Sequence, residues 1–214
     1  PVVMGLVKGA LEVRHFVFGI IGIFVYMGIE VGTPTYVNMY LVNTPELGIN
    51  AATAGLIVAV YWALMMVGRF VGASIGSKVS SRAMITTVSS ATLVLVLFGM
   101  FAPTDVTVSV PGIDWANLSV IWAQVPVGIF AFLLVGLCSS VMWGGIFNMA
   151  VEGLGKYTAV ASGIFMTMVF GCAVMLAIQA QVAEMTDYMT SYWVVVFCAV
   201  YLLFYALVGS KVKK

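Results

Sequence analysis

Charged residues are scarce in this sequence. Lys, Arg, Asp and Glu make up 8% of its 214 residues, whereas soluble domains carry about 25%. A chain of this length needs many more charged side chains to cover a water-facing surface, so the composition excludes an ordinary soluble domain. Hydrophobic residues account for 63% of the chain, and the mean hydropathy is +1.13. These values predict a polytopic membrane protein.

The residue patterns of metal, nucleotide and nucleic-acid chemistry are also absent. The sequence has no HExxH or Walker motif, and its cysteines fall singly inside apolar runs, so we expect no metal and no cofactor. Residues 72-76 match the GxSxG pattern of hydrolases, but no strand is expected before them and the only histidine is His15. An enzyme is therefore not expected. The net charge is only +1, and the charged residues are scattered singly along the chain, so no basic surface for a nucleic-acid partner is expected.

Six apolar segments are long enough to cross a bilayer core of about 30 Å. They are residues 16-42, 52-75, 83-102, 125-149, 159-183 and 191-209. None alternates apolar and polar residues as the strands of a membrane barrel do, so the sequence predicts an all-α protein with six transmembrane helices. Residues 1-15 are predicted to be a linker or cytoplasmic segment, residues 103-124 the longest external loop, and residues 210-214 a cytoplasmic tail.

The orientation in the membrane follows from the positive charges. All nine Lys and Arg residues fall before the first span, in alternate connections or at the span end next to one, or in the tail, at Lys8, Arg14, Arg69, Lys78, Arg82, Lys156, Lys211, Lys213 and Lys214. In the other connections every charged residue is acidic: these are Glu46, Asp105, Asp114, Glu184 and Asp187. The positive-inside rule therefore predicts that both termini are cytoplasmic.

Glu30 is the only ionisable residue deep inside a predicted span. An unpaired carboxylate at that depth costs about 3 kcal/mol or more, so Glu30 must face protein or water. Helical spacing places Glu30, Pro34 and Asn38 on one face, where a carboxyl group, a carbonyl freed by proline and an amide point the same way. This pattern favours a substrate-binding or protonatable group. The alternative is a protonated Glu30 that only joins helices.

A second group of candidate residues lies in the fourth span. Trp143 and Asn148 flank Gly144-Gly145, and Ser139 and Ser140 precede them by one turn. Aromatic faces combined with amides and hydroxyls suit a sugar, whose C-H faces stack while its hydroxyls need hydrogen bonds. The alternative for Trp143 is ordinary packing between helices, because aromatic residues make up 13% of the chain.

Glycine and proline interrupt the first span of each half of the sequence, at residues 28-34 and at Gly144-Gly145. Paired interruptions at corresponding positions are typical of transporters built from two three-helix repeats. Gly68 and Gly72 form a GxxxG unit, which lets two helices approach closely, and Arg69 lies between them. We expect gating or structural roles for Gly68, Arg69, Gly72 and Pro34.

Three stretches resemble the major facilitator superfamily, and within it the fucose:proton symporter and glucose/galactose permease group. They are residues 26-32 with 38-41, residues 68-72, and residues 143-147 continuing through 152-158. The stretches occur in order and align with the carboxyl-terminal six helices of a twelve-helix carrier. The resemblance implies half of a major-facilitator fold, a cavity lined by Glu30 and Asn38 from the seventh helix, and Trp143 at the cavity-facing aromatic position of the tenth.

Two features depart from the group. Gly144-Gly145 stands where the group commonly has Pro-Thr after the aromatic residue. The coupling carboxylates of the fucose symporter type lie in the amino-terminal half and are therefore absent from this sequence. Both departures concern substrate and coupling rather than the fold.

The resemblance implies the carboxyl-terminal half of a secondary active transporter in a bacterial inner membrane. It would take up a monosaccharide of the fucose, glucose or galactose type by proton or sodium symport with alternating access. Its partners would be a sugar, a coupling cation, the lipid bilayer, and an amino-terminal six-helix half or a second protomer. The alternative function is an autonomous six-helix protein that acts as a homodimeric channel or assembly module.

Overall fold

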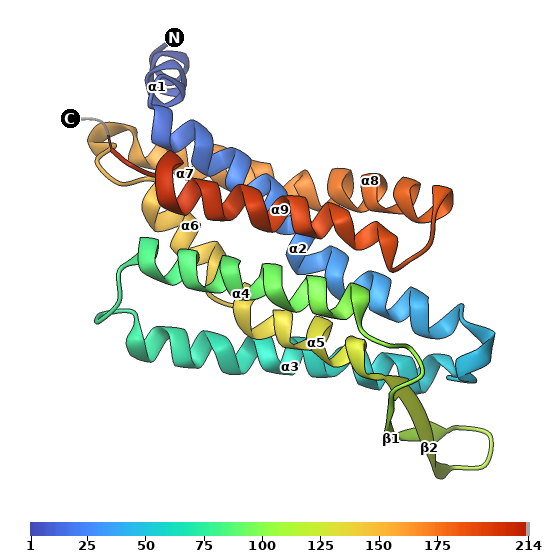
Figure 1. Cartoon of the computed structure of the whole chain (residues 1–214). Coiled ribbons are helices and arrows are strands. Elements are labelled where there is room, and N and C mark those ends of the chain that lie inside the picture. The colour runs from blue at the N-terminus through green and yellow to red at the C-terminus, as the bar shows by residue number, and fades with distance from the viewer. Residues whose placement is uncertain (213–214) are drawn as a thin grey trace.

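The computed structural model describes residues 1–212 and contains six apolar helical segments long enough to cross a membrane (Figure 1). They are Arg14–Val42, Ala51–Ile75, Ser81–Phe101, Val127–Ala150, Gly155–Met185 and Thr190–Gly209. These bounds agree with the predicted spans to within a few residues, so the prediction of six helical spans is confirmed. Residues 213 and 214, the end of the predicted tail, lie outside the described residues.

Several of the spans are divided into shorter helices. The α-helices are α1 (Val2–Leu11), α2 (Arg14–Val42), α3 (Ala51–Ile75), α4 (Ser81–Phe101), α5 (Val127–Ser139), α6 (Met142–Ala150), α7 (Thr158–Thr167), α8 (Gly171–Met185) and α9 (Trp193–Phe204). A π-helical turn, Tyr205–Gly209, extends α9. The segment predicted as a linker or cytoplasmic segment therefore includes the helix α1.

Side-chain caps explain where two of the spans begin. The Asn50 side chain accepts a hydrogen bond from the Thr53 N–H at 2.8 Å, and the Ser80 hydroxyl accepts one from the Ala83 N–H at 3.2 Å. Each cap satisfies a backbone donor that the first turn of a helix leaves without a partner. The polar residues between the apolar runs therefore fix the starts of α3 and α4.

The helix α2 runs through the centre of the bundle. In Figure 1 it passes between a layer of α8 and α9 and a layer of α3, α4 and α5, and it packs against α8, α9, α3 and α5. Glycine allows this close packing: a Cβ at Gly28 would lie 2.9 Å from the Met175 Cβ, and a Cβ at Gly32 would lie 2.6 Å from the Gln179 Oε1. Two-thirds of the apolar window of α2 is buried (67%), the largest share among the six spans. Its side chains therefore meet residues from both layers.

The GxxxG glycines of α3 lie against the fourth span. A Cβ at Gly68 would overlap the Ser140 hydroxyl, and a Cβ at Gly72 would overlap a methyl group of Val141. Both glycines are buried. The close approach that the sequence predicted for this face of α3 is therefore present.

The long connection that was predicted to be an external loop contains a β-hairpin that the sequence analysis did not predict. Strands β1 (Thr107–Asp114) and β2 (Ser119–Pro126) pair in antiparallel register (Figure 1). The hairpin is tied to the start of α3, because the Ile113 N–H donates to the Thr53 hydroxyl at 3.3 Å and the Asn50 amide donates to the Ile113 carbonyl at 3.0 Å. The alternating valines at positions 106, 108 and 110 could have indicated the first strand from the sequence.

Candidate functional site

The fourth span is interrupted between α5, which ends at Ser139, and α6, which begins at Met142. The sequence analysis placed this interruption at Gly144-Gly145, but both glycines lie inside α6, about one turn later. The hydroxyls of Ser139 and Ser140 donate to carbonyls of the last turn of α5, at 3.3 and 2.5 Å. Serine side chains compete with backbone donors in this way, which explains why the helix ends here.

The first span continues through Pro34, yet the proline changes the bonding of the helix. Proline has no N–H, so the carbonyl of Glu30, four residues earlier, lacks its helical donor. The Tyr61 hydroxyl of α3 donates to this carbonyl at 2.9 Å. The same Tyr61 oxygen lies 3.2 Å from the Ser139 hydroxyl at the end of α5. One buried tyrosine thus joins the two irregular points of the bundle.

A second tyrosine serves the other interruption. The Tyr26 hydroxyl of α2 donates to the Ser139 carbonyl at 3.1 Å. The last carbonyls of a helix lack donors within it, and a buried carbonyl without a partner costs about 1–3 kcal/mol. Tyr26 and Tyr61 therefore stabilise backbone that α2 and α5 cannot pair internally.

Glu30 forms an ion pair with Arg69 of α3. The Glu30 Oε1 lies 3.5 Å from the Arg69 Nη2, and the Glu30 side chain is 15% exposed while that of Arg69 is 58% exposed. Among residues 1–212 this is the one ion pair within 4 Å. The pair offsets part of the cost of a carboxylate at membrane depth. The sequence analysis considered Glu30 and Arg69 separately and did not predict their contact.

Arg69 opens onto a groove of about 230 Å³ between α3, the start of α4 and α6, here called the Arg69 groove. Gly72, Gly144 and Asn148 also line it. The groove therefore brings together Arg69 and Asn148, two residues that the sequence analysis had assigned to gating and to substrate binding.

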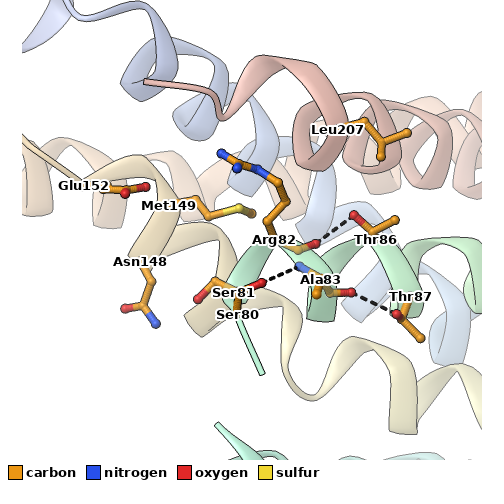
Figure 2. A pocket seen from close by; sticks show the side chains of 10 residues that line it. All are labelled: Ser80, Ser81, Arg82, Ala83, Thr86, Thr87, Asn148, Met149, Glu152 and Leu207. Carbon is orange, nitrogen blue, oxygen red and sulfur yellow. Dashed lines mark hydrogen bonds between the residues drawn. The ribbon is translucent and has the colours of Figure 1, made fainter. Parts of the chain in front are cut away.

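Asn148 also lines a larger cavity of about 720 Å³, the Arg82 pocket (Figure 2). Figure 2 shows Asn148 and Glu152 on one side of the pocket and Arg82 and Thr86 of α4 on the other. The Arg82 Nε donates to the Ser210 hydroxyl at 3.3 Å. Polar groups of α4 and α6 thus continue from Asn148 to the end of the bundle that carries both termini.

Asn38 lies in a different cavity. The Asn38 pocket has a volume of about 420 Å³ between α2 and α3, and Pro34, Thr35, Gly55 and Trp62 are among the residues that line it. Asn38 and Pro34 share this cavity, as their common helical face predicted. Glu30 does not line this cavity, although it lies on the same face of α2, one turn before Pro34.

Trp143 belongs to a cluster of aromatic side chains. Its ring is stacked on Phe147, with centroids 5.6 Å apart, and meets the edge of Phe165 at 5.5 Å. It lines none of the three cavities described above. The four residues predicted to bind substrate therefore lie apart: Asn38 in its own pocket, Asn148 in the Arg69 groove, Glu30 against Arg69 but not among the residues that line the groove, and Trp143 in the aromatic cluster.

Comparisons with known proteins agree with the resemblance found in the sequence. No family model matches the chain. A glucose/galactose transporter of Brucella abortus biovar 1 (strain 9-941) is 29% identical over 202 residues, which cover 94% of this chain and 44% of the relative. A putative glucose/galactose transporter of Helicobacter pylori (strain J99) is 28% identical over 211 residues, covering 95% of this chain and 46% of the relative. The chain thus spans less than half the length of these curated relatives.

Solved structures show the same fold. The major facilitator superfamily transporter FucP in the outward conformation matches with a TM-score of 0.75 and 19% identity, over 90% of this chain and 42% of FucP. A second structure, of the E. coli fucose:proton symporter FucP, matches with a TM-score of 0.78 and 18% identity, over 94% of this chain and 44% of that one. The chain is a multi-pass membrane protein with half of a major-facilitator fold, and its resemblance to this superfamily is confirmed.

Proposed function

We propose that this chain is the carboxyl-terminal half of a secondary active transporter. The transporter takes up a monosaccharide of the glucose, galactose or fucose type by cation symport with alternating access, and it has no enzymatic activity. The names of the sequence relatives support the sugar class, since they are called glucose/galactose transporters. The likeness to a fucose:proton symporter supports coupling to a cation.

The observation that carries the proposal is the Glu30–Arg69 pair. Ionisable residues at membrane depth commonly line substrate or ion pathways. Glu30 lies on the central helix, and Arg69, at 3.5 Å, lines a groove that leads to Asn148. A carboxylate offers acceptors and a guanidinium offers donors, which together bind the hydroxyls of a sugar.

The remaining predicted residues take supporting roles in this proposal. Asn38 and Asn148 bind sugar hydroxyls on either side of the Glu30–Arg69 pair, each from its own cavity. Trp143 provides an aromatic surface beside Gly144. Gly68, Gly72 and Pro34 allow the helices to approach and reorient during alternating access, because each lies where two spans meet.

We also propose the location and partners of the chain. Both termini are cytoplasmic, because the positive charges lie on their side of the spans. The membrane is a bacterial inner membrane, because the sequence relatives are bacterial. An amino-terminal six-helix half, or a second protomer, completes the translocation path. The coupling ion is a proton or sodium.

Uptake by cells that express the complete protein tests the proposal. Radiolabelled D-glucose, D-galactose and L-fucose are offered in turn, with a protonophore or with sodium removed. We expect uptake of at least one sugar that depends on one of the two gradients, and a five- to 150-fold loss of apparent affinity in Glu30→Gln, because poorly paired sugar hydroxyls cost about 1–3 kcal/mol each. Glu12→Gln, an exposed residue beyond α1, is the matched control. No uptake of any of the three sugars would contradict the proposal and favour the homodimeric channel or assembly module.

A further inference from the structure

One face of α3 connects the Asn38 pocket with the Arg69 groove. Exposed residues recur along it at helical spacing, at Gly55, Ala59, Trp62, Met66, Arg69 and Ala73. The first three line the Asn38 pocket, and the last two line the Arg69 groove. Trp62 lies seven residues before Arg69, which corresponds to about 10 Å along a helix axis. The two cavities are therefore successive places along one surface.

Trp62 contributes an aromatic ring to the lining of the Asn38 pocket. It is 45% exposed, although it lies in the interior of a membrane-spanning helix. Its ring meets the buried ring of Tyr61 edge-on, with centroids 5.1 Å apart at 89°. Because the hydroxyl of Tyr61 is held by the Glu30 carbonyl, this contact fixes the orientation of the indole.

Polar groups of α2 lie on the opposite wall of the Asn38 pocket. The Asn38 amide has no hydrogen-bond partner within the described part of the chain, so its donors and acceptor are free for a ligand. The Thr35 hydroxyl donates to the Val31 carbonyl at 2.6 Å, which leaves its oxygen free to accept. The cavity of about 420 Å³ lies within the range of about 300–1,000 Å³ that is usual for small-ligand sites.

We infer that the Asn38 pocket is a separate monosaccharide subsite, in which Trp62 stacks on the C–H face of the sugar ring and Asn38 binds its hydroxyls. A flat apolar ring opposite an unpaired amide matches the two chemically different sides of a pyranose. This inference rests on the proposed function. It adds a binding place nearer the hairpin end of the bundle than the Glu30–Arg69 pair, and it makes Trp62 the stacking residue there.

Glycines of the chain provide a steric test of this subsite. A Cβ at Gly55, which lines the Asn38 pocket, would meet nothing within 4 Å. Gly55→Leu therefore fills the pocket without a clash, and leucine also favours the helix more than glycine does. A Cβ at Gly163 of α7 likewise meets nothing within 4 Å, and Gly163 lines none of the described cavities. Gly163→Leu is the matched control.

The experiment measures equilibrium binding of D-glucose, D-galactose and L-fucose to the purified complete protein, with a thermal melt of each variant. Trp62→Leu and Gly55→Leu are expected to weaken binding about three- to tenfold, the usual effect of one aromatic contact. Trp62→Tyr retains a stacking ring and is expected to bind within about twofold of wild type, as is Gly163→Leu. All four variants are expected to melt close to the wild-type temperature.

The outcomes separate this inference from the proposed function. Wild-type affinity in both Trp62→Leu and Gly55→Leu overturns the subsite and leaves the proposed function standing, and it assigns Trp62 to a lipid-facing surface. A loss in Trp62→Leu alone also overturns it, because filling the pocket then has no effect. Absence of binding of all three sugars to the wild-type protein overturns the subsite and the proposed function together.

Discussion

The Tyr61 hydroxyl donates a hydrogen bond to the Glu30 carbonyl at 2.9 Å, across the contact between α3 and α2. This carbonyl needs a donor from outside its helix because Pro34 supplies none. The carbonyl belongs to the same residue whose carboxylate pairs with Arg69. Tyr61 therefore positions the part of α2 that holds the proposed binding carboxylate.

This relationship predicts a specific coupling between Tyr61 and Pro34. Tyr61→Phe leaves the Glu30 carbonyl without a donor and is expected to reduce the free energy of unfolding by about 1–3 kcal/mol. In a Pro34→Ala background the backbone N–H at position 34 takes over, so the same change is expected to cost less. Thermal or denaturant unfolding of the single and double variants measures the difference.

Tyr192→Phe is the matched control for that cycle. The Tyr192 hydroxyl donates to the Thr33 carbonyl at 2.7 Å, and Val37, four residues after Thr33, retains its own N–H. Its effect on stability is therefore expected to be the same in the wild-type and the Pro34→Ala backgrounds. Equal costs of Tyr61→Phe in the two backgrounds would contradict the role assigned to Tyr61.

The Glu30–Arg69 pair predicts a partial rescue. Arg69→Gln leaves the carboxylate of Glu30 unpaired and is expected to destabilise the protein by about 1–2 kcal/mol, less than the about 3–5 kcal/mol of a fully buried pair, because Arg69 is 58% exposed and solvent screens it. The double variant Glu30→Gln/Arg69→Gln removes both charges and is expected to be more stable than Arg69→Gln alone. Melting temperatures of Arg69→Gln, Glu30→Gln and the double variant in detergent test this. Additive effects of the two single changes would show that the two charges do not interact.

The close approach of α3 to the fourth span predicts which glycines tolerate a side chain. Gly68→Leu and Gly72→Leu place atoms where Ser140 and Val141 already lie, and are expected to reduce stability by about 1–3 kcal/mol and to lower the yield of folded protein. Gly163→Leu meets open space and is expected to be neutral. Size-exclusion profiles and melts of the purified variants distinguish these results, and wild-type behaviour of Gly72→Leu would place this face of α3 away from the fourth span.

The proposed orientation predicts which positions are accessible from outside the cell. In a background without the native cysteines, single cysteines replace exposed residues of the predicted external connections at Glu46, Ser109 and Asp187, and of the cytoplasmic ones at Ser80, Lys156 and Val212. The first three are expected to react with an impermeant thiol reagent added to intact cells, and the last three only after the membrane is opened. Reversed labelling would invert the orientation.

The hairpin predicts a local dependence on pH. The Asn117 side-chain amide and the N–H groups of residues 116 and 117 hold the pKa of Asp114 below its usual value. A carboxylate with a lowered folded pKa stabilises its turn above the ordinary Asp pKa of about 3.9 and loses this effect as the pH falls through the folded pKa. The protection factors of the hairpin amides, taken relative to the intrinsic exchange rate at each pH, are therefore expected to fall at acidic pH in wild type and to be less pH-dependent in Asp114→Asn.

The sequence by itself determined the six spans and the need of the Glu30 carboxylate for a partner. Both depend on local properties: a bilayer core demands about 20 apolar residues per helix, and a carboxylate at that depth needs a partner wherever the neighbouring helices lie. The glycine pattern of α3 was equally local, since GxxxG spacing places small residues on one face of any helix. These features could be predicted because hydropathy and helical period require no knowledge of the tertiary structure.

Only the tertiary structure decided which residues meet. The contact of Arg69 with Glu30 and the bond from Tyr26 to Ser139 depend on how each helix is rotated and tilted, and hydropathy does not determine either. The same reason separates Asn38 from Asn148, which the sequence had grouped in one site. The first helix of the fourth span ends at Ser139 rather than at Gly144, at the point where the hydroxyls of Ser139 and Ser140 bond to the Gly136 and Leu137 carbonyls.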